Sequence, residues 1–387
     1  MQAAALEQEA HTLLDMVANK QCTLAESILE MDVAEYSDPS RFEREKYTLF
    51  RDHAQFVGPS CLLPEAGDHF AFDDTGIPLL VVRKENGKLA AYVNICSHRG
   101  APLAQGFGKA QKGRLLSCPY HGWRYNLNGE LTAIPQGKQG FGDLDRAAHG
   151  LRPVQVGERD GCIFVMPNPE LGFDIEDTLG GLGPQLSGFG LSDHHLLGTK
   201  RVETDMNWKL NLDTFQEFYH FDALHPDTIA QMSHGNICHY EKFGRNHSMS
   251  SPTLQIDELR QQEPQYWQPR KYVSFVIYLF PNTVLFVVED HFQTWRVYPL
   301  SHKRSVVYHS MYLPEPPKNE AERIEKENYF QMINDVAVTE DYALVERIQR
   351  GINADLDRTV IIGRNEPGVQ NMHRQIQDIM NTHRRPA

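Results

Sequence analysis

The sequence feature that most limits what this chain can fold into is a pair of short Cys/His segments. Cys96 and His98 are separated by one residue, and Cys118 and His121 follow after an interval of 19 residues. Each segment offers one thiol and one imidazole, whereas a zinc finger places two cysteines in one segment and two histidines in the other. The mixed arrangement suits a [2Fe-2S] cluster in which one iron binds both thiolates and the other binds both imidazoles. The alternatives are a zinc site and four residues with no common function.

The residues around these segments suit two loops that approach each other closely. Glycines and prolines give the loops tight, stiff turns. Trp123 and Tyr125 follow the second segment, and they either shield the site from solvent or belong to an ordinary core. The turn-forming residues are Gly100, Pro102, Pro119 and Gly122.

The two segments, read as CSHRGAPL and CPYHGWRY, resemble the Rieske motif. Their separation is longer than is usual in that family, which we interpret as a longer loop. The resemblance implies that Cys96, His98, Cys118 and His121 bind one Rieske [2Fe-2S] cluster. The other cysteines show no partner pattern and are expected to be buried free thiols: Cys22, Cys61, Cys162 and Cys238.

Composition excludes several classes of protein. The 387 residues include 38 basic and 51 acidic side chains, a formal net charge of −13, which argues against nucleic-acid binding. The apolar runs are shorter than the roughly 20 residues of a membrane span, and the N-terminal residues lack the pattern of a secretory signal. Six cysteines are too few for a disulfide scaffold. We therefore expect a cytoplasmic protein.

The chain texture predicts an α+β protein of two domains. Residues 45–167 contain short strands between turns and predict an all-β domain, and residues 1–44 and 168–387 predict the second domain. Residues 5–19 and 318–350 have helical periodicity, and the second of these should cover an antiparallel sheet. Four strands are predicted for that sheet: Tyr272–Phe280, Thr283–Val288, Gln293–Leu300 and Ser305–Leu313.

A second constellation lies in the segment NWKLNLDTFQEFYHFDALHP, residues 207–226. Asp213, Glu217 and His220 are spaced i, i+4 and i+7, which predicts one helical face. His225 lies five residues beyond His220, roughly 140° around an ideal helix. It reaches the same metal only where the helix unwinds, and Pro226 disfavours helix at His225. Two histidines with one carboxylate are typical of oxygen-activating non-haem Fe(II) sites, which keep open positions for O2.

This segment also resembles the Rieske oxygenases, the α-subunits of ring-hydroxylating oxygenases and their monooxygenase relatives. The resemblance implies that His220 and His225 bind iron in a helix-grip catalytic domain. Glu217 then corresponds to the acidic bridge to a Rieske histidine of a neighbouring subunit, and Glu at this position is typical of the branch acting on small quaternary amines. Asp341 takes the third ligand position, with Asp335 as the alternative. Glu340 is expected to face solvent.

The resemblance implies a catalytic cycle with an external electron donor. A reductase or ferredoxin would reduce the cluster, and O2 would be the co-substrate at one mononuclear Fe(II) per chain in a homotrimer. The chain has no dinucleotide fingerprint, so NAD(P)H would act only through the reductase. A basic loop of Lys109, Lys112 and Arg114 either attracts an acidic donor or is simply solvated.

Alternatives remain open for both substrate and class. The substrate is either an aromatic compound or an amine or quaternary ammonium compound. The competing classes are a Rieske electron carrier without oxygenase activity and a zinc-stabilised binding module. Pocket positions are expected at Val276, Tyr278, Phe280, Leu285 and Val287, with aromatic contributions from Tyr272, Trp295 and Tyr308.

Overall fold

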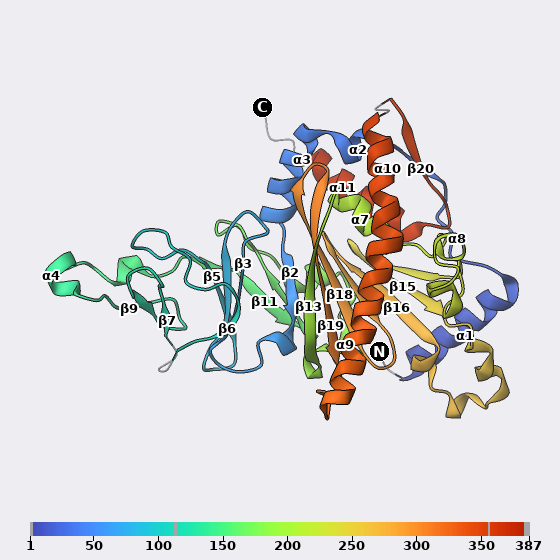
Figure 1. Cartoon of the computed structure of the whole chain (residues 1–387), viewed down its shortest axis with the longest axis horizontal. Coiled ribbons are helices and arrows are strands. Elements are labelled where there is room, and N and C mark those ends of the chain that lie inside the picture. Colours follow the sequence, from blue (N-terminus) through green and yellow to red (C-terminus); the bar gives the residue numbers. More distant parts are fainter. Residues whose placement is uncertain (1–2, 112–114, 355–356, 383–387) are drawn as a thin grey trace. The chain divides into compact units, whose positions relative to one another are not determined.

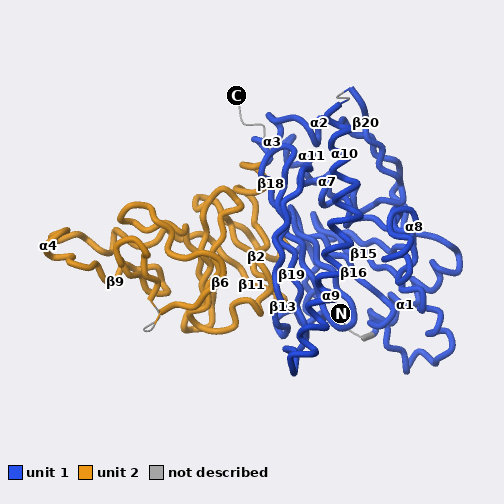
Figure 2. The backbone as a smooth tube through the Cα atoms, in the orientation of Figure 1, with its two compact units in different colours: residues 1–45, 179–387 blue, residues 46–178 orange. Residues whose placement is uncertain are grey.

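The computed structural model describes residues 3–111, 115–354 and 357–382, and the chain divides into two compact units (Figure 2). Unit 2 comprises residues 46–178, and unit 1 is formed by the segments on either side of it, residues 1–45 and 179–387. The second boundary lies later than the predicted residue 167. Gln155 explains the difference, because its side-chain amide donates to the carbonyl of Phe173 at 2.6 Å and accepts from the Phe173 N–H at 2.8 Å.

Unit 2 is built almost entirely from short antiparallel strands, as the sequence predicts. A five-stranded sheet has the order β10-β5-β4-β3-β6, and two three-stranded sheets have the orders β11-β12-β2 and β7-β8-β9. The strands are β2 (Gln55–Pro59), β3 (Asp68–Phe72), β4 (Leu79–Arg83), β5 (Leu89–Val93), β6 (Gly106–Lys109), β7 (Leu116–Ser117), β8 (Arg124–Tyr125), β9 (Leu131–Ala133), β10 (Pro153–Val154), β11 (Val156–Arg159) and β12 (Cys162–Val165).

The smaller helical segments of unit 2 lie between and beyond these strands. They are the π-helical η1 (Lys46–Arg51), the 3-10 turns η2 (Ser60–Leu62) and η3 (Ala147–His149), and the helices α4 (Gly137–Phe141) and α5 (Ile175–Leu179), the last of which ends at the boundary with unit 1. The first Cys/His segment follows β5, and the second forms the turn between β7 and β8.

Unit 1 is organised around one seven-stranded antiparallel sheet of order β13-β19-β18-β17-β16-β15-β14 (Figure 1). The four predicted strands are confirmed as β16 to β19, because their apolar and β-branched residues form one continuous meander. The strands are β13 (His195–Thr204), β14 (His239–Phe243), β15 (Asn246–Pro252), β16 (Val273–Leu279), β17 (Thr283–Val287), β18 (Phe292–Ser301) and β19 (Arg304–Leu313), and a separate pair joins β1 (Leu29–Asp32) to β20 (Thr359–Ile362).

The predicted long helix of unit 1 crosses the sheet in Figure 1 and contains a π-helical turn. It consists of α9 (Glu320–Val336), η9 (Ala337–Tyr342) and α10 (Ala343–Ala354). Its start is capped by Asn319, whose side chain accepts the N–H of Glu322 at 3.0 Å. A π-helical turn inside an α-helix often marks a functional site, because the wider turn changes which side chains share a face.

The remaining helices of unit 1 are short, apart from those at the two ends of the chain. They are α1 (Ala3–Asn19), α2 (Ala34–Ser37), α3 (Pro39–Glu45), α6 (Gly183–Ser187), α7 (Trp208–Asp213), α8 (Phe221–Leu224) and α11 (Pro367–Thr382), with 3-10 turns η4 (Leu191–Asp193), η5 (Ile229–Gln231), η6 (Ile256–Gln261), η7 (Pro264–Tyr266) and η8 (Pro269–Lys271). Among the described residues, no helix is both long and apolar enough to cross a membrane.

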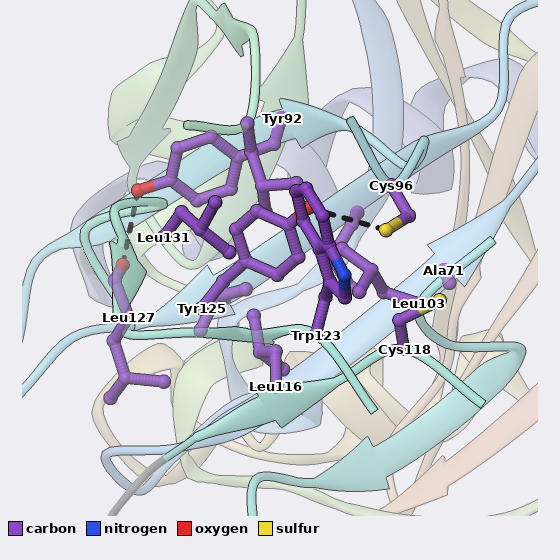
Figure 3. Close-up of a cluster of buried hydrophobic side chains, with 13 residues drawn as sticks. Ala71, Tyr92, Cys96, Leu103, Leu116, Cys118, Trp123, Tyr125, Leu127 and Leu131 are labelled. Carbon is purple, nitrogen blue, oxygen red and sulfur yellow. Dashed lines mark hydrogen bonds between the residues drawn. The ribbon is translucent and has the colours of Figure 1, made fainter. Parts of the chain in front are cut away.

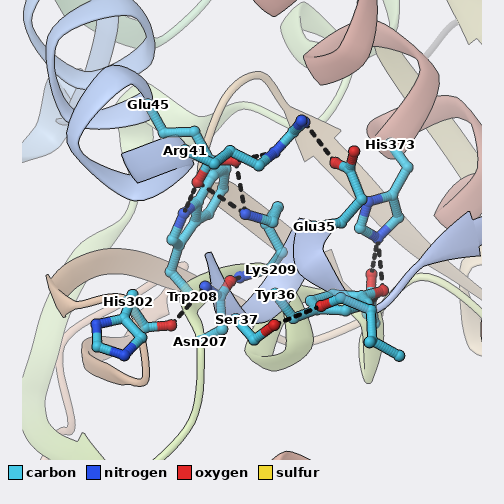
Figure 4. A network of polar contacts seen from close by, with 12 residues as sticks. Glu35, Tyr36, Ser37, Arg41, Glu45, Asn207, Trp208, Lys209, His302 and His373 are labelled. Atoms are coloured by element: carbon cyan, nitrogen blue, oxygen red, sulfur yellow. Dashed lines mark hydrogen bonds and ion pairs between the residues drawn. The ribbon is translucent and has the colours of Figure 1, made fainter. Parts of the chain in front are cut away.

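A buried polar network anchors α7, which leads into the second constellation (Figure 4). Lys209 Nζ lies 2.7 Å from both carboxylate oxygens of Glu45, and both side chains are at most 1% exposed. Trp208 Nε1 and Arg41 Nε also donate to Glu45, each at 3.0 Å. This carboxylate therefore joins α7 to α3 through two donors, Trp208 and Lys209, while Arg41 holds it from within α3.

Candidate metal centres

The two Cys/His segments of unit 2 have the same backbone design. The N–H of Cys96 donates to Ala101 and that of Cys118 to Trp123, each at 2.8 Å. The N–H groups of Gly100 and Gly122 return to the carbonyls of Cys96 and Cys118. Both glycines have φ near +75° (79° and 71°), a conformation that side chains with a Cβ rarely adopt. The result is two equivalent turns, each presenting one cysteine and one histidine.

The side chains of these turns lie where a shared cluster requires them. Cys96 and Cys118 are 1% and 3% exposed, and the rings of His98 and His121 are 4.6 Å apart. His98 Nδ1 is buried and has no hydrogen-bond partner in the described parts of the chain. A buried, unpaired imidazole nitrogen beside a second histidine and two interior thiols fits an iron-sulfur cluster with sulfur and nitrogen ligands.

Trp123 and Tyr125 both contact this site (Figure 3). The Trp123 ring stacks on His98 with centroids 4.9 Å apart, and the Tyr125 hydroxyl lies 3.2 Å from Cys96 Sγ. Tyr125 also accepts the N–H of Ser97 at 3.1 Å. Burial, with a further contribution from Cys96, raises the pKa of Tyr125 to about 12, so its hydroxyl remains a hydrogen-bond donor at neutral pH.

The second constellation has a different local structure from the one predicted. The predicted common helical face of Asp213, Glu217 and His220 is wrong, because α7 ends at Asp213 and a turn carries the chain to α8. Glu217 Oε2 accepts the N–H groups of Tyr219 and His220 at the start of α8. His225 follows the end of α8 with φ −115° and ψ 38°, which confirms that the chain leaves the helical conformation before Pro226.

His220, His225 and Asp341 nevertheless converge. Asp341 Oδ1 lies 3.5 Å from His220 Nε2 and 3.3 Å from His225 Nε2. The ligand atoms of the three residues all lie within 4.8 Å of one another. His225 and Asp341 are buried, and His220 is half-buried. Two imidazoles and one carboxylate in this spacing fit a 2-His-1-carboxylate iron site, which leaves further coordination positions open.

Each histidine of this set uses its other ring nitrogen to contact a carboxylate. His220 Nδ1 contacts Glu217 Oε1, and His225 Nδ1 lies 2.6 Å from Glu340 Oε2. The prediction that Glu340 faces solvent is therefore wrong. Glu340 and Asp341 both belong to the π-helical turn η9, whose wider turn lets adjacent residues reach opposite sides of the His225 ring. Thr228 also donates to Glu340, at 2.8 Å.

The electrostatics of the set favour a bound cation. Burial alone would lower the pKa of His220, but Asp341 and Glu217 outweigh it and raise that pKa to about 9. Burial raises the pKa of Asp341, and the contacts with His220 and His225 outweigh this and hold it below its usual range. Two carboxylates thus surround each imidazole, and a divalent cation would balance their charge.

Two other acidic residues lie outside the direct contacts. Asp335 is exposed and accepts a hydrogen bond from Gln331 at 2.6 Å, which leaves it apart from the histidines. Asp213 accepts from the Tyr36 hydroxyl at 2.8 Å and lies 2.9 Å from His373 Nε2. It lines a cavity of about 250 Å³ together with Glu217, His220 and Glu366.

A second cavity of about 120 Å³ shares His220 and Asp341 with the first and is mostly apolar. We call it the inner chamber. It is lined by the three candidate iron ligands His220, His225 and Asp341 and by apolar side chains, among them Phe215, Phe221, Val276, Val284, Phe286 and Trp295. Val276 and Trp295 were predicted. The expected positions Leu285 and Val287 are wrong, because the pleat of β17 directs the alternate residues to the chamber. Four further expected residues do not line it: Tyr272, Tyr278, Phe280 and Tyr308.

The other predicted polar groups have local roles. Lys109 is ion-paired with Glu65 and Asp68, so its charge is neutralised, and Lys112 and Arg114 lie outside the described residues. A second group of side chains that could bind a metal ion joins α1 to β14 and consists of Glu9, His239 and Glu241. There His239 Nδ1 contacts Glu9 Oε1 at 2.8 Å, a hydrogen bond that ties the first helix to the sheet.

Two protein-family models match the chain, and each covers one of the two constellations. The model of the Rieske [2Fe-2S] domain matches residues 53–154, and that of the ring-hydroxylating α-subunit catalytic domain matches residues 191–382. The chain belongs to the Rieske oxygenase α-subunits. The match of the first family covers both Cys/His segments, and the match of the second covers His220, His225 and Asp341.

Individual relatives of this Rieske oxygenase subunit agree with the family. The chain is 27% identical to the carnitine monooxygenase oxygenase subunit of Escherichia coli K12 over 82% of this chain and 83% of the relative. It is 33% identical to the glycine betaine monooxygenase oxygenase subunit of Chromohalobacter salexigens, a match that spans 51% of this chain and 43% of that protein.

Solved structures show the same fold. A quaternary ammonium Rieske monooxygenase bound to an inhibitor superimposes with a TM-score of 0.79 at 21% identity, over 92% of this chain and 96% of that one. Naphthalene 1,2-dioxygenase from Rhodococcus sp. gives a TM-score of 0.72 at 18% identity, over 98% and 99% of the two chains.

Sequence reasoning missed Glu340 as the partner of His225. A general rule could have found it, because metal-binding histidines almost always donate their second ring N–H to an acceptor such as a carboxylate. Glu217 satisfies that rule for His220, and His225 needed a second acidic residue. The spatial contacts of Asp213 with Tyr36 and His373 had no such signal, because these residues lie far apart in the chain.

Proposed function

We propose that this α-subunit is an oxygenase that receives electrons from a separate reductase or ferredoxin and uses O2 to oxidise a small organic substrate. The observation that carries the proposal is the convergence of His220, His225 and Asp341 beside the inner chamber. A Rieske electron carrier, the alternative class, does not need two histidines and a carboxylate that converge beside an apolar cavity.

The residues of the chain would hold two metal centres. Cys96, His98, Cys118 and His121 would bind the [2Fe-2S] cluster, and His220, His225 and Asp341 would bind one Fe(II). The iron, when bound, supplies the reduction and activation of O2. The surrounding residues do the rest: Glu217 and Glu340 fix the two imidazole rings, and the apolar walls of the inner chamber exclude water.

Electrons are proposed to cross between subunits of a homotrimer through Glu217. This carboxylate contacts His220 and also lines the 250 Å³ cavity. The same cavity bears exposed apolar side chains, Leu344, Ile348 and Ile361, suited to contact with another chain. A related quaternary ammonium Rieske monooxygenase has been described with inter-subunit electron transfer. Asp213, held by Tyr36 and His373, is proposed to position this wall.

The substrate class is proposed from the chamber and the relatives together. Phe215, Phe286 and Trp295 supply an aromatic surface that accepts either a flat ring or, through cation-π attraction, a quaternary ammonium group. Relatives acting on carnitine and glycine betaine favour the second. We therefore propose oxidation of a small quaternary ammonium compound, with an aromatic substrate as the alternative.

Metal and sulfide analysis tests the proposal. The purified holoprotein should contain about two cluster irons, two acid-labile sulfides and one further iron per chain. With a surrogate reductase, NAD(P)H and glycine betaine, it should consume O2. When the O2 is isotopically labelled, the label should appear in the oxidation product. Zinc in place of iron, or cluster reduction without oxygen uptake on quaternary ammonium or aromatic compounds, would rule the proposal out.

A further inference from the structure

A third cavity of about 240 Å³ adjoins the inner chamber, and we call it the outer chamber. The two chambers share four lining residues: Phe221, Ile229, Phe286 and Ile333. Apart from His220, His225 and Asp341 the inner chamber is mostly apolar, whereas the outer chamber carries charged side chains on the segments just before β16 and just after β17. A molecule that occupies both would place one end beside His220 and His225 and its other end among these charges.

Arg270 is the charged residue of the outer chamber that is best prepared to bind a ligand. It lies on η8, is half-buried, and donates one guanidinium hydrogen bond, to the Val288 carbonyl at 2.8 Å. Its guanidinium also lies over the Phe189 ring at 5.1 Å. Arg270 has no ion-pair partner among the described residues, so donors of its planar fork remain available.

The acidic residues nearby do not satisfy this guanidinium. Asp290 is held by His291 Nδ1 at 2.8 Å and by Lys326 at 3.1 Å. Glu289 is exposed and contributes only a longer-range attraction to Arg270. Lys271 adds a second positive charge to the same wall. With Asp290 paired elsewhere, Arg270 and Lys271 face only one further carboxylate, that of Glu289. This wall of the outer chamber is therefore positively charged, although the chain as a whole has a net charge of −13.

We propose that Arg270 binds a carboxylate at the distal end of the substrate, and that the substrate is an organic acid whose reacting end occupies the inner chamber. This inference rests on the proposed function and narrows its substrate class. A planar guanidinium backed by a backbone carbonyl and an aromatic ring matches a carboxylate with two parallel hydrogen bonds. Arg270 thus sets specificity, while the metal ligands set reactivity.

Matched probes test the proposal by direct binding to the holoprotein. Glycine betaine and choline share a trimethylammonium group and differ in carboxylate against alcohol, and benzoate and benzyl alcohol differ in the same way. Dissociation constants would be measured by equilibrium dialysis with labelled probes. The wild-type chain should bind the acid of at least one pair roughly 10- to 100-fold more tightly than the alcohol, the range expected for a charge-assisted hydrogen bond.

Three variants separate the guanidinium from charge alone. Arg270→Gln should abolish the preference for the acid over the alcohol, and Arg270→Lys should keep part of it. Lys271→Gln should reduce this preference less than Arg270→Gln does. Unchanged cluster absorbance and thermal midpoint would show that each variant is folded. The proposal fails where Arg270→Gln keeps the preference, where Lys271→Gln costs as much, or where the wild-type chain binds none of the four probes or binds acid and alcohol equally.

Failure of the proposed function gives a different result. A chain without the third iron, or without oxygen uptake on either class of substrate, would contradict oxygenase activity while the acid preference stayed measurable. An oxygenase that oxidises choline and glycine betaine alike would contradict only the role of Arg270.

Discussion

Glu340 Oε2 lies 2.6 Å from His225 Nδ1, and Asp341, its neighbour in the chain, lies 3.3 Å from Nε2 of the same ring. Two consecutive carboxylates therefore contact opposite edges of one imidazole. The π-helical turn at Ala337–Tyr342 makes this possible. The orientation of His225 is fixed from behind by Glu340, which leaves Nε2 directed toward the proposed iron position.

Glu340→Gln should weaken iron binding without affecting the cluster. Loss of a carboxylate behind a metal-binding histidine typically costs 10- to 100-fold in metal affinity. The measurement is iron retained per chain during titration with a chelator, with the visible absorbance of the cluster as an internal reference. Asp335→Asn is the matched control. Asp335 lies on α9, which leads directly into the π-helical turn of Glu340, but its side chain is exposed. Equal iron retention in the two variants would remove Glu340 from the site.

Glu217→Ala should separate reduction of the cluster from formation of product. The carboxylate contacts His220 and lines the cavity proposed to receive a neighbouring subunit, so its loss breaks the electron path. In a single-turnover experiment with pre-reduced cluster and full iron loading, product yield should fall at least tenfold. Glu366→Gln, in the same cavity, should retain coupling. Unaltered yield in Glu217→Ala would show that electrons take another route.

Tyr125→Phe should lower the reduction potential of the cluster. The Tyr125 hydroxyl lies 3.2 Å from Cys96 Sγ, and a hydrogen bond to a cluster sulfur stabilises the reduced, more negative state. A tenfold change in this one-electron equilibrium corresponds to about 60 mV, which is the order of shift expected. Redox titration followed by circular dichroism measures it. A rise in potential, or no change, would contradict the donor role of Tyr125.

The sequence could predict which candidate metal ligands lie together, because their spacing reflects short-range chemistry. Cys96, His98, Cys118 and His121 occupy two tight turns, and His220 and His225 flank one short helix ending before Pro226. The meander was also predictable, because alternating apolar strands separated by turn residues specify their own pairing.

The rest depended on tertiary structure. The spacing of Asp213, Glu217 and His220 suited a helix, but Glu217 bonds the backbone at the start of α8 and the chain turns there instead. The role of Glu340 required the π-helical turn, which has no simple sequence signature. Arg270 became a candidate binding residue only when η8 was placed beside the outer chamber.

Lowering the pH should reduce the free energy of unfolding of unit 1, because two of its histidines are buried in the neutral form. Burial lowers the pKa of His247 and His309 to about 3, whereas an unfolded histidine titrates near 6.5. Between these values the unfolded chain binds protons that the folded chain does not, so stability is lost as pH falls below about 6.5. Each histidine contributes up to about 1.4 kcal/mol per pH unit.

Urea unfolding at pH 7 and pH 5 checks this dependence. His309→Gln should reduce the difference in unfolding free energy between the two pH values, even if it lowers stability at pH 7. His195→Gln, at an exposed position, should retain the wild-type difference. An undiminished difference in His309→Gln would mean that other groups cause the acid sensitivity.

Lys209→Met should destabilise unit 1 more than removal of the whole ion pair. Lys209 and Glu45 are at most 1% exposed, so the single variant leaves a buried carboxylate without its main cation. The expected loss is about 3–5 kcal/mol, because an uncompensated buried charge keeps its desolvation cost. Glu45→Gln combined with Lys209→Met should recover part of this loss, since Arg41 still pairs with Glu35. Urea unfolding of the four proteins of the cycle gives the coupling energy, and strictly additive effects would show that the pair does not hold α7 as a unit.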